Sequence, residues 1–503
     1  MPRVVSRFPV GSAELDAVLR PRTDLVIEER AGEGRFVAAS GPVRSYQRTV
    51  DVDGAGGVAT QTVDFKLDVP YFAWLFVLPF KRTISRPPRG EIPPWWAPPT
   101  PLDARASSVL GSLAALSVVL AYLNTLFTQT VAFAGEEFGV GDSGQGVAGS
   151  IVRLGGLLAL AVVALADRRG RRKVLLVATL LGCTLAVTGA AAPSMAWLTA
   201  SQTVARAFAT ALLLLVAIMV SEEVPARCRA YGVSLLAMAG GLGAGFCLVA
   251  LKLADLGPRG WRILYVLPLA GLPVLVSVAK RLPESRRYLA PHPDVRIGGH
   301  WSRLILLMAG GLLANVFIAP QTQFANRFLR NERGFSAGRI SLLSLVSGAP
   351  GVIGIVFGGR LAELRGRRPV AALALSSGSL CTVAFFYASG WTVWFWPVIG
   401  TILSAAAIPS LSVYGPELFP TSLRGKANGI LGVSGLAGSA IGLALAGVLA
   451  DHYGHIGPAM AILYTGPLLV AALILTRYPE TAGRELEELN PEDYPPPLPP
   501  RIL

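Results

Sequence analysis

The sequence predicts an all-α membrane protein of twelve transmembrane helices in two related halves, preceded by a small extension that contains β-strands. Three observations lead to this prediction. Hydrophobic residues make up 52% of the 503 residues and charged residues only 15%, whereas soluble domains carry about 25% charged residues. Long apolar segments recur along the chain, and two loop motifs repeat 195 or 196 residues apart. Most of the protein is therefore expected to lie in the lipid bilayer.

The first hundred residues differ in composition from the rest. VRSYQRTVDV and VATQTVDFKLDV are rich in Val and Thr, and the DGAGG between them predicts the turn of a β-hairpin. The apolar stretch 71–80 is too short to span a membrane and favours either the membrane interface or the edge of a small domain's core. The proline-rich stretch 86–101 predicts a stiff, extended linker, with Trp95 and Trp96 at the lipid headgroups.

The apolar segments after residue 107 are each about 20 residues long, enough to cross roughly 30 Å of hydrocarbon. They lack the polar faces that helices of a soluble protein would show. The predicted spans are 108–132, 147–166, 174–192, 197–220, 231–251, 262–280, 303–320, 338–358, 370–389, 392–415, 427–449 and 458–476. The predicted parts are a cytoplasmic extension (1–85), a linker (86–106), a first six-helix bundle (107–280), a cytoplasmic loop (281–302), a second bundle (303–477) and a cytoplasmic tail (478–503).

The distribution of basic residues sets the expected orientation. If residue 107 lies inside, most loop arginines and lysines fall on the cytoplasmic side, as multi-pass proteins require, and both termini are cytoplasmic. The net charge of +14 then needs no nucleic-acid partner. The abundance of Arg, Ala and Gly favours a bacterial inner membrane, so the expected location is the plasma membrane.

Catalytic and metal chemistry find no support in the sequence. The four cysteines stand singly, without the spacing of a disulfide framework or a metal site. The histidines lie in loops on different sides, so no cluster of nucleophiles, carboxylates or ligands forms at one depth. No enzyme activity, metal or cofactor is expected.

Two loop motifs repeat between the halves, as in transporters built from two related six-helix units. The pattern acidic-x-x-Gly-basic-basic stands at Asp167, Gly170, Arg171 and Arg172, and 196 residues later at Glu363, Gly366, Arg367 and Arg368. The pattern Glu-x-x-Pro-x-x-x-Arg stands at Glu222, Pro225 and Arg229, and 195 residues later at Glu417, Pro420 and Arg424. The glycines allow tight turns, while the acids can hold helix N-termini or arginines of neighbouring loops. We therefore expect these loops to act as conformational gates.

The motifs resemble those of the major facilitator superfamily, and more narrowly its sugar porters and organic ion transporters. The loop with Asp167, Arg168 and Gly170 is similar to the family's signature between helices 2 and 3, with Val163 where the family has Gly. In the second half, Gly359 restores that glycine.

Two further motifs carry the resemblance, which covers about residues 105–490. Pro283 and Glu284 open the segment PESRRYL after span six, similar to the branch's PESPRYL. Pro479 and Glu480 open PETAG after span twelve, similar to its PETKG. The resemblance implies two six-helix bundles that rock around a central cavity lined by spans 1, 4, 7 and 10. Glycines of spans five and eleven, such as Gly243 and Gly438, are expected either where the halves slide or in ordinary packing.

Arg206, near the middle of span four, is the first candidate for substrate binding or coupling, because ionisable residues in hydrocarbon are costly. A structural bond to a helix carbonyl is the alternative role. Asn124, Asn315 and Tyr414, on the spans that would line the cavity, complete the candidate set. Arg153, nearer the outer end of span two, is expected to snorkel towards the surface.

The substrate expected is a small organic anion or metabolite taken up by a monomer through alternating access. An intramembrane arginine favours an anion over a cation. A proton is the candidate coupling ion, although no Asp or Glu lies deep in a span, and Glu136 and Glu137 beyond span one are expected to be exposed loop acids. Multidrug or organic-cation efflux is the alternative. A transporter-like sensor is the alternative of a different class, because the N-terminal extension is unusual for the family.

Overall fold

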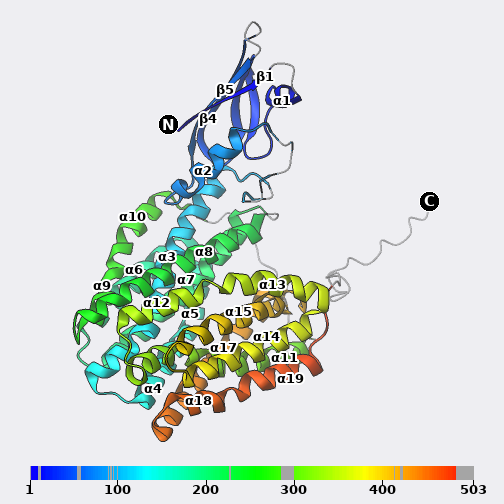
Figure 1. Ribbon diagram of the computed structural model, residues 1–503. Coiled ribbons are helices and arrows are strands. Elements are labelled where there is room, and N and C mark those ends of the chain that lie inside the picture. The colour runs from blue at the N-terminus through cyan, green and yellow to red at the C-terminus, as the bar shows by residue number, and fades with distance from the viewer. Residues whose placement is uncertain are drawn as a thin grey trace, which may run out of the picture.

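The computed structural model describes residues 2–9, 13–53, 58–88, 90, 93–94, 96–98, 100–225, 228–284, 300–412, 414–419 and 423–482. A small domain of strands stands at one end of a large helical region (Figure 1). We call residues 2–88 the N-terminal domain, the end of the helical region beside it the domain side, and the opposite end the far side.

The N-terminal domain is an antiparallel sheet of five strands in the order β1-β5-β4-β3-β2. The strands are β1 (Arg3–Pro9), β2 (Ile27–Gly32), β3 (Arg35–Ser40), β4 (Val43–Asp53) and β5 (Val58–Leu67), with the helices α1 (Ala13–Val18) and α2 (Ala73–Ile84). The β4–β5 pairing, from Val43 opposite Leu67 to Asp53 opposite Val58, confirms the predicted hairpin. The sequence pattern did not predict the other three strands.

A buried polar network helps to fix this sheet. The carboxylate of Glu28 accepts hydrogen bonds from the guanidinium of Arg48 at 2.8 and 2.5 Å and from the hydroxyl of Tyr46 at 2.5 Å. Burial and the Glu28 carboxylate hold the pKa of Tyr46 well above its ordinary value. Arg48 also donates to the carbonyls of Val18 and Arg20. Every charged group of this cluster therefore has a partner, as buried charges require.

Helix α2 packs in the core of the small domain and also has an outer face compatible with the second role that the sequence left open for the stretch 71–80. On one face, Phe80 and Ile84 are buried in the core of the sheet. On the other, Trp74, Leu75 and Leu78 are exposed, and the helix ends with Lys81 and Arg82. A helix with apolar residues on its outer face and cations at its end suits the surface of a bilayer.

Twelve helical segments in the described part of the chain are long and apolar enough to cross a membrane, which confirms the predicted number. The spans of the first half are 104–138, 142–166, 171–191, 195–220, 231–256 and 260–281. Those of the second half are 301–332, 337–359, 367–387, 392–412, 427–453 and 456–477. Span 1 extends beyond its predicted end, because α3 (Ala104–Phe138) continues as a helix past the apolar residues.

The remaining helices of the first half are α4 (Asp142–Leu154), α5 (Ala159–Arg169), α6 (Arg171–Val187), α7 (Met195–Glu223), α8 (Arg229–Ala250), α9 (Ile263–Val266) and α10 (Gly271–Arg281). Those of the second half are α11 (Trp301–Arg327), α12 (Ala337–Gly348), α13 (Gly351–Arg365), α14 (Arg367–Tyr387), α15 (Thr392–Ser412), α16 (Tyr414–Glu417), α17 (Arg424–Tyr453), α18 (Ile456–Leu463) and α19 (Thr465–Arg477). Short 3₁₀ turns, such as Gly155–Leu158 between α4 and α5, join pieces of one span.

Gly243 of span five and Gly438 of span eleven pack within their own halves, which is the ordinary packing that the sequence left open beside a sliding contact. A Cβ on Gly243 of α8 would lie 2.0 Å from the carbonyl oxygen of Val118 in α3, and one on Gly438 of α17 would lie 2.2 Å from that of Leu312 in α11. Small residues allow such close helix contact. Close contacts between the halves include that of Gly146 in α4, whose Cβ would meet the carbonyl of Leu443 in α17 at 2.4 Å, and that of Gly447 in α17, whose Cβ would meet the carbonyl of Asp142 at 2.5 Å.

Candidate functional site

The acidic residues of the PES and PET segments cap helices on the domain side. The carboxylate of Glu284 accepts from the backbone N–H of Arg172 at 3.0 Å, at the start of α6. Glu480 does the same for α14, accepting from the N–H groups of Arg367 at 3.0 Å and Arg368 at 3.2 Å. A negative charge at a helix N-terminus satisfies free N–H groups and the helix dipole. The two halves therefore use the same cap, 196 residues apart.

The motif glycines make room for these caps. Gly170 and Gly366 have φ angles of +95° and +93°, a backbone conformation that residues with a Cβ atom rarely adopt. A Cβ at either position would lie 2.8 Å from an oxygen of Glu284 or Glu480. Glycine is thus required by both backbone conformation and space.

The last arginine of each motif holds the end of a span in the same half. The guanidinium of Arg172 donates to the carbonyls of Leu282 and Ala279, each at 2.6 Å. Arg368 donates in the same way to the carbonyls of Ile474 and Leu475. These arginines are therefore structural ties between spans 3 and 6 and between spans 9 and 12.

Other motif residues on the domain side also pair within one half. The buried guanidinium of Arg171 forms an ion pair with Glu222, and Arg105 pairs with Glu223 at 3.2 Å. Arg367 donates to the Oγ of Thr481 at 2.8 Å. Arg168 and Pro225 are exposed, whereas Pro283, Pro479 and Gly359 are partly exposed. The side chains of Asp167, Arg229, Glu363, Glu417 and Arg424, and the whole of Pro420, lie outside the described residues.

The structure brings Arg206 and Asn124 together. A guanidinium N–H of Arg206, on α7, donates to the backbone carbonyl of Asn124, on α3. Arg153 of α4 lies close enough for the two positive charges to repel each other. Its guanidinium also donates to the hydroxyl of Thr322 in α11, at 3.4 Å. Among the described residues, neither arginine forms an ion pair with a carboxylate.

The other two candidate residues lie elsewhere. Asn315 of α11 donates to the carbonyl of Gly311 at 2.8 Å and accepts from the hydroxyl of Ser439 at 3.3 Å. Tyr414 is buried beside Tyr478, with ring centroids 5.1 Å apart, in the apolar cluster at the domain side of the second half. Its hydroxyl has no hydrogen-bond partner among the described residues. Asn315 thus joins two helices of the second half, and Tyr414 belongs to a packed core.

The halves meet at the far side through two matching helix caps that the sequence analysis missed. The carboxylate of Asp451, in α17, accepts from the N–H groups of Asp142 at 3.0 Å and Ser143 at 2.9 Å, at the start of α4. Asp255, at the end of span 5, accepts from the N–H groups of Ala337 and Gly338, each at 2.7 Å, at the start of α12. A signal was present, because Leu-Ala-Asp stands at 253–255 and again at 449–451.

Further contacts join the halves on the same side. Arg327 pairs with Asp142 at 2.6 Å and Arg330 with Glu136 at 3.2 Å. The amide of Gln323 donates to the carbonyl of Gln145 at 3.0 Å. Arg327 and Arg330, two basic residues on the far side, thus pair with acids of the other half. The contacts described above for the domain side, in contrast, stay within one half.

Glu136 and Glu137 are part of helix α3 rather than of a loop, which corrects the sequence prediction. The Glu137 side chain is only 13% exposed. It accepts from the indole N–H of Trp261 at 2.8 Å and from the guanidinium of Arg262 at 2.8 and 3.1 Å. It therefore ties the start of span 6 to the end of span 1.

Comparisons with known proteins agree with this architecture. The family model of the Major Facilitator Superfamily matches residues 112–320 and 305–501. The chain is 27% identical over 375 residues to the niacin transporter NiaP of Acinetobacter baylyi, covering 65% of this chain and 83% of the relative.

Solved structures show the same fold. The inward-open xylose transporter XylE from E. coli superposes with a TM-score of 0.64 at 18% identity, covering 77% of this chain and 99% of that one. The nucleoside transporter NupG gives a TM-score of 0.61 at 13% identity, covering 74% and 100%. The chain belongs to the Major Facilitator Superfamily and is a membrane transporter of small solutes, not an enzyme.

Proposed function

We propose that this protein carries a small organic anion across the plasma membrane, and that Arg206 and Arg153 hold the negative charge of that substrate. The observation that carries the proposal is that Arg206, bonded to the Asn124 carbonyl, and Arg153, bonded to Thr322 of the other half, lie within the membrane spans and form no ion pair with a carboxylate among the described residues. An arginine at the centre of a membrane span costs about 2.5–3.5 kcal/mol on insertion scales. An anionic ligand between the two guanidinium groups would offset that cost and their mutual repulsion.

The carbonyl of Asn124 supports this reading. Its single bond to Arg206 orients the guanidinium but supplies no full negative charge. Most of the five N–H donors of an arginine thereby remain available, and their planar fork matches a carboxylate in bidentate geometry. Thr322 lies beside Arg153 on the opposite half, so a ligand there would contact both halves. Contact with both halves is what a substrate needs to couple its binding to their movement.

The niacin transporter relative adds chemical support. Niacin is a monocarboxylic acid with an aromatic ring, and its carboxyl group is ionised at neutral pH. Similarity at 27% identity does not transfer a substrate. We therefore propose the class, aromatic and other small monocarboxylates, rather than one compound.

For the orientation, we propose that the domain side is cytoplasmic, with both termini on that side, in a bacterial inner membrane. The bias of arginine and lysine towards the loops on that side supports this orientation. The described contacts between the halves gather at the far side. This is the arrangement expected of an alternating-access transporter that is closed to the outside, and we propose uptake by a monomer as its mode of transport.

Ligand-induced stabilisation tests the substrate class. The detergent-purified protein is screened by thermal shift against nicotinate and other monocarboxylates, sugars, amino acids and organic cations. A ligand at 100 times its Kd stabilises the folded state by about 2.7 kcal/mol. Monocarboxylates should raise the melting temperature of the wild type and of an Arg339→Ala control, whose exposed arginine lies on the far side. They should not raise that of Arg206→Ala or Arg153→Ala.

Three results would change the proposal. Equal stabilisation of Arg206→Ala and wild type by the acids would remove Arg206 from the site. Stabilisation by cations alone would favour organic-cation efflux. If deletion of residues 1–100 left uptake into proteoliposomes intact, the sensor alternative would fail. The same vesicles, with and without an inward proton gradient, test whether a proton is the coupling ion.

A further inference from the structure

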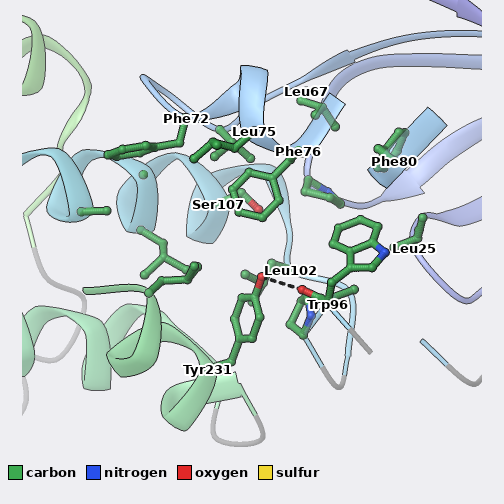
Figure 2. A pocket seen from close by; sticks show the side chains of 18 of the residues that line it. Leu25, Leu67, Phe72, Leu75, Phe76, Phe80, Trp96, Leu102, Ser107 and Tyr231 are labelled. Carbon is green, nitrogen blue, oxygen red and sulfur yellow. Dashed lines mark hydrogen bonds between the residues drawn. The ribbon is translucent and has the colours of Figure 1, made fainter. Parts of the chain in front are cut away.

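An apolar cavity lies where the N-terminal domain meets the membrane helices. Its volume is about 130 Å³, and its walls come from α2, the linker, α3 and α8. Figure 2 shows Phe72, just before α2, and Leu75 and Phe76 of α2 at the top, Tyr231 of α8 at the bottom, and Trp96 of the linker to their right. The Tyr231 hydroxyl donates to the Trp96 carbonyl at 3.2 Å and so fixes the linker against α8. Apolar walls offer a water molecule few hydrogen-bond partners. Apolar cavities of about this size therefore stay dry and accept apolar ligands.

The cavity runs along the membrane spans to the depth of one leaflet. Its lining on α3 extends from Ser107 to Ala114, and its lining on α8 from Tyr231 to Leu242. At about 1.5 Å per residue, the α8 stretch covers roughly 16 Å, which is close to half of the roughly 30 Å hydrocarbon core. An acyl chain of the leaflet on the domain side has this length and lies at this depth.

The mouth of the cavity faces lipid. Met238 of α8 is 68% exposed, and Leu242 and Leu75 are also exposed. These residues line the cavity while presenting apolar surface on the outside of the membrane region. A lipid chain can therefore enter sideways from the bilayer.

Polar groups are placed where the head of a lipid would lie. The hydroxyl of Ser107 is buried in the cavity wall and has no hydrogen-bond partner among the described residues. It lies in the first turn of α3, the level at which the ester groups of a phospholipid leave the hydrocarbon. A second hollow of about 500 Å³ shares Asp24 and Trp96 with the cavity and is lined by Arg82 and Arg86.

The two arginines are available to a phosphate. Both are exposed, and neither forms an ion pair with any described residue. Asp24, the acid in the same hollow, is already neutralised by Arg22 at 2.9 Å. The hollow therefore carries a net positive charge that complements an anionic headgroup.

We propose that this cavity binds one acyl chain of an anionic phospholipid from the leaflet on the domain side, with the headgroup at Arg82 and Arg86. The lipid would fill the gap between α2 and spans 1 and 5, and so tie the N-terminal domain to the first half. This proposal does not depend on the transported substrate.

Native mass spectrometry of the full chain tests the acyl site. The protein is stripped of lipid in a non-ionic detergent and titrated with phosphatidylglycerol, phosphatidylcholine of the same chains, or oleate. The wild type should retain one phosphatidylglycerol. Met238→Trp and Leu75→Trp, which fill the mouth from two elements, should weaken retention by at least about tenfold. Val249→Trp, on an exposed part of α8 that does not line the cavity, is the matched control and should behave as wild type.

The headgroup site is tested separately by charge removal. Arg82→Gln with Arg86→Gln should abolish the preference for phosphatidylglycerol over phosphatidylcholine. The control Arg35→Gln with Arg44→Gln removes the same charge from exposed positions of the same domain. This control should keep the preference for phosphatidylglycerol. Equal phosphatidylglycerol retention by the wild type and both mouth variants would overturn the acyl site. If the protein bound oleate but not phosphatidylglycerol, the occupant would be a soluble amphiphile and the phospholipid proposal would be wrong. If Arg82→Gln with Arg86→Gln left the preference for phosphatidylglycerol unchanged, the headgroup assignment would be wrong.

Discussion

The carboxylate of Asp451 accepts a hydrogen bond from the backbone N–H of Asp142 at 3.0 Å, so a residue near the end of span 11 caps the first helix of span 2 in the opposite half. Asp255 caps the start of span 8 in the same way from span 5. The two aspartates are 196 residues apart, which is the same shift that relates the loop motifs. The far side is therefore held by a pair of equivalent bonds that break when the halves separate.

Replacing these aspartates should favour opening of the far side. Removing a helix cap costs about 0.5–2 kcal/mol, and here the cost falls only on the state in which the halves touch. Asp451→Ala and Asp255→Ala should each shift the equilibrium towards the open far side by roughly 2- to 30-fold. Spin labels at Leu256 and Trp391, exposed far-side positions in different halves, should report a longer distance.

A cap within one half provides the control for this shift. Ser194 caps α7, its side chain accepting from the N–H of Trp197 at 3.3 Å, so both partners of this cap belong to the first half. Ser194→Ala should lower stability slightly and leave the label distances unchanged. If Ser194→Ala opened the far side as much as Asp451→Ala, general destabilisation rather than loss of the inter-half cap would explain the result.

The motif glycines should not tolerate alanine. Gly170→Ala and Gly366→Ala would place a Cβ 2.8 Å from a carboxylate oxygen, in a backbone conformation that is nearly restricted to glycine. Such strain costs on the order of 1–3 kcal/mol. The melting temperature of each variant in detergent should fall clearly below that of the wild type. Gly245→Ala, where a Cβ would meet nothing within 4 Å, should have little effect, and an equal fall there would refute the steric explanation.

The sequence predicted the helices better than the contacts between them. Long apolar runs give the number and place of the spans, because length and hydropathy alone decide whether a helix can cross lipid. Glu284 was identified by its resemblance to the family's PESPRYL motif, and Gly170, 114 residues before it in the chain, was identified by the repeat. The repeat did not identify Asp255 or Asp451, because their partners are backbone N–H groups in the other half, which any residue supplies.

Arg206 illustrates the same limit. The sequence showed that Arg206 lies in a membrane span, where a charged side chain is costly. Its proximity to Arg153 depends on how α4 and α7 pack. The strands of the N-terminal domain were missed for another reason. β2, with the sequence IEERAG, has little apolar alternation and is largely exposed, so its pairing with β3 determines its structure.

The cap formed by Glu480 should make stability depend on pH. Partial burial raises the pKa of its carboxyl, but the backbone N–H groups of Arg367, Ala482 and Arg368 outweigh this effect, so the pKa lies below its ordinary value of 4.5. A lowered folded-state pKa contributes stability that is present above the unfolded pKa and is lost as the pH falls through the folded pKa. Glu480→Gln should therefore be less stable than the wild type at pH 7. The difference in melting temperature should shrink below pH 4.5.

An exposed acid separates this effect from general acid denaturation. Glu33 lies on the surface of the N-terminal domain, and Glu33→Gln should melt as the wild type does at every pH. A difference between Glu480→Gln and wild type that stayed constant as the pH fell from 7 to 3 would mean that the carboxylate charge does not stabilise the cap.

The buried pair Arg48–Glu28 should be essential to the N-terminal domain. Arg48→Met would leave the Glu28 carboxylate buried with only neutral donors, Tyr46 and a backbone N–H. Breaking a buried pair by removing one partner costs about 3–5 kcal/mol, which is a large share of the stability of a small sheet. Limited proteolysis should cleave the domain of this variant while the membrane region stays intact. The double variant Arg48→Met with Glu28→Gln removes the uncompensated charge and should recover part of the resistance; if it did not, the packing of the Arg48 stem against Phe36, 4.0 Å from its guanidinium carbon to the ring centre, would be the dominant contribution.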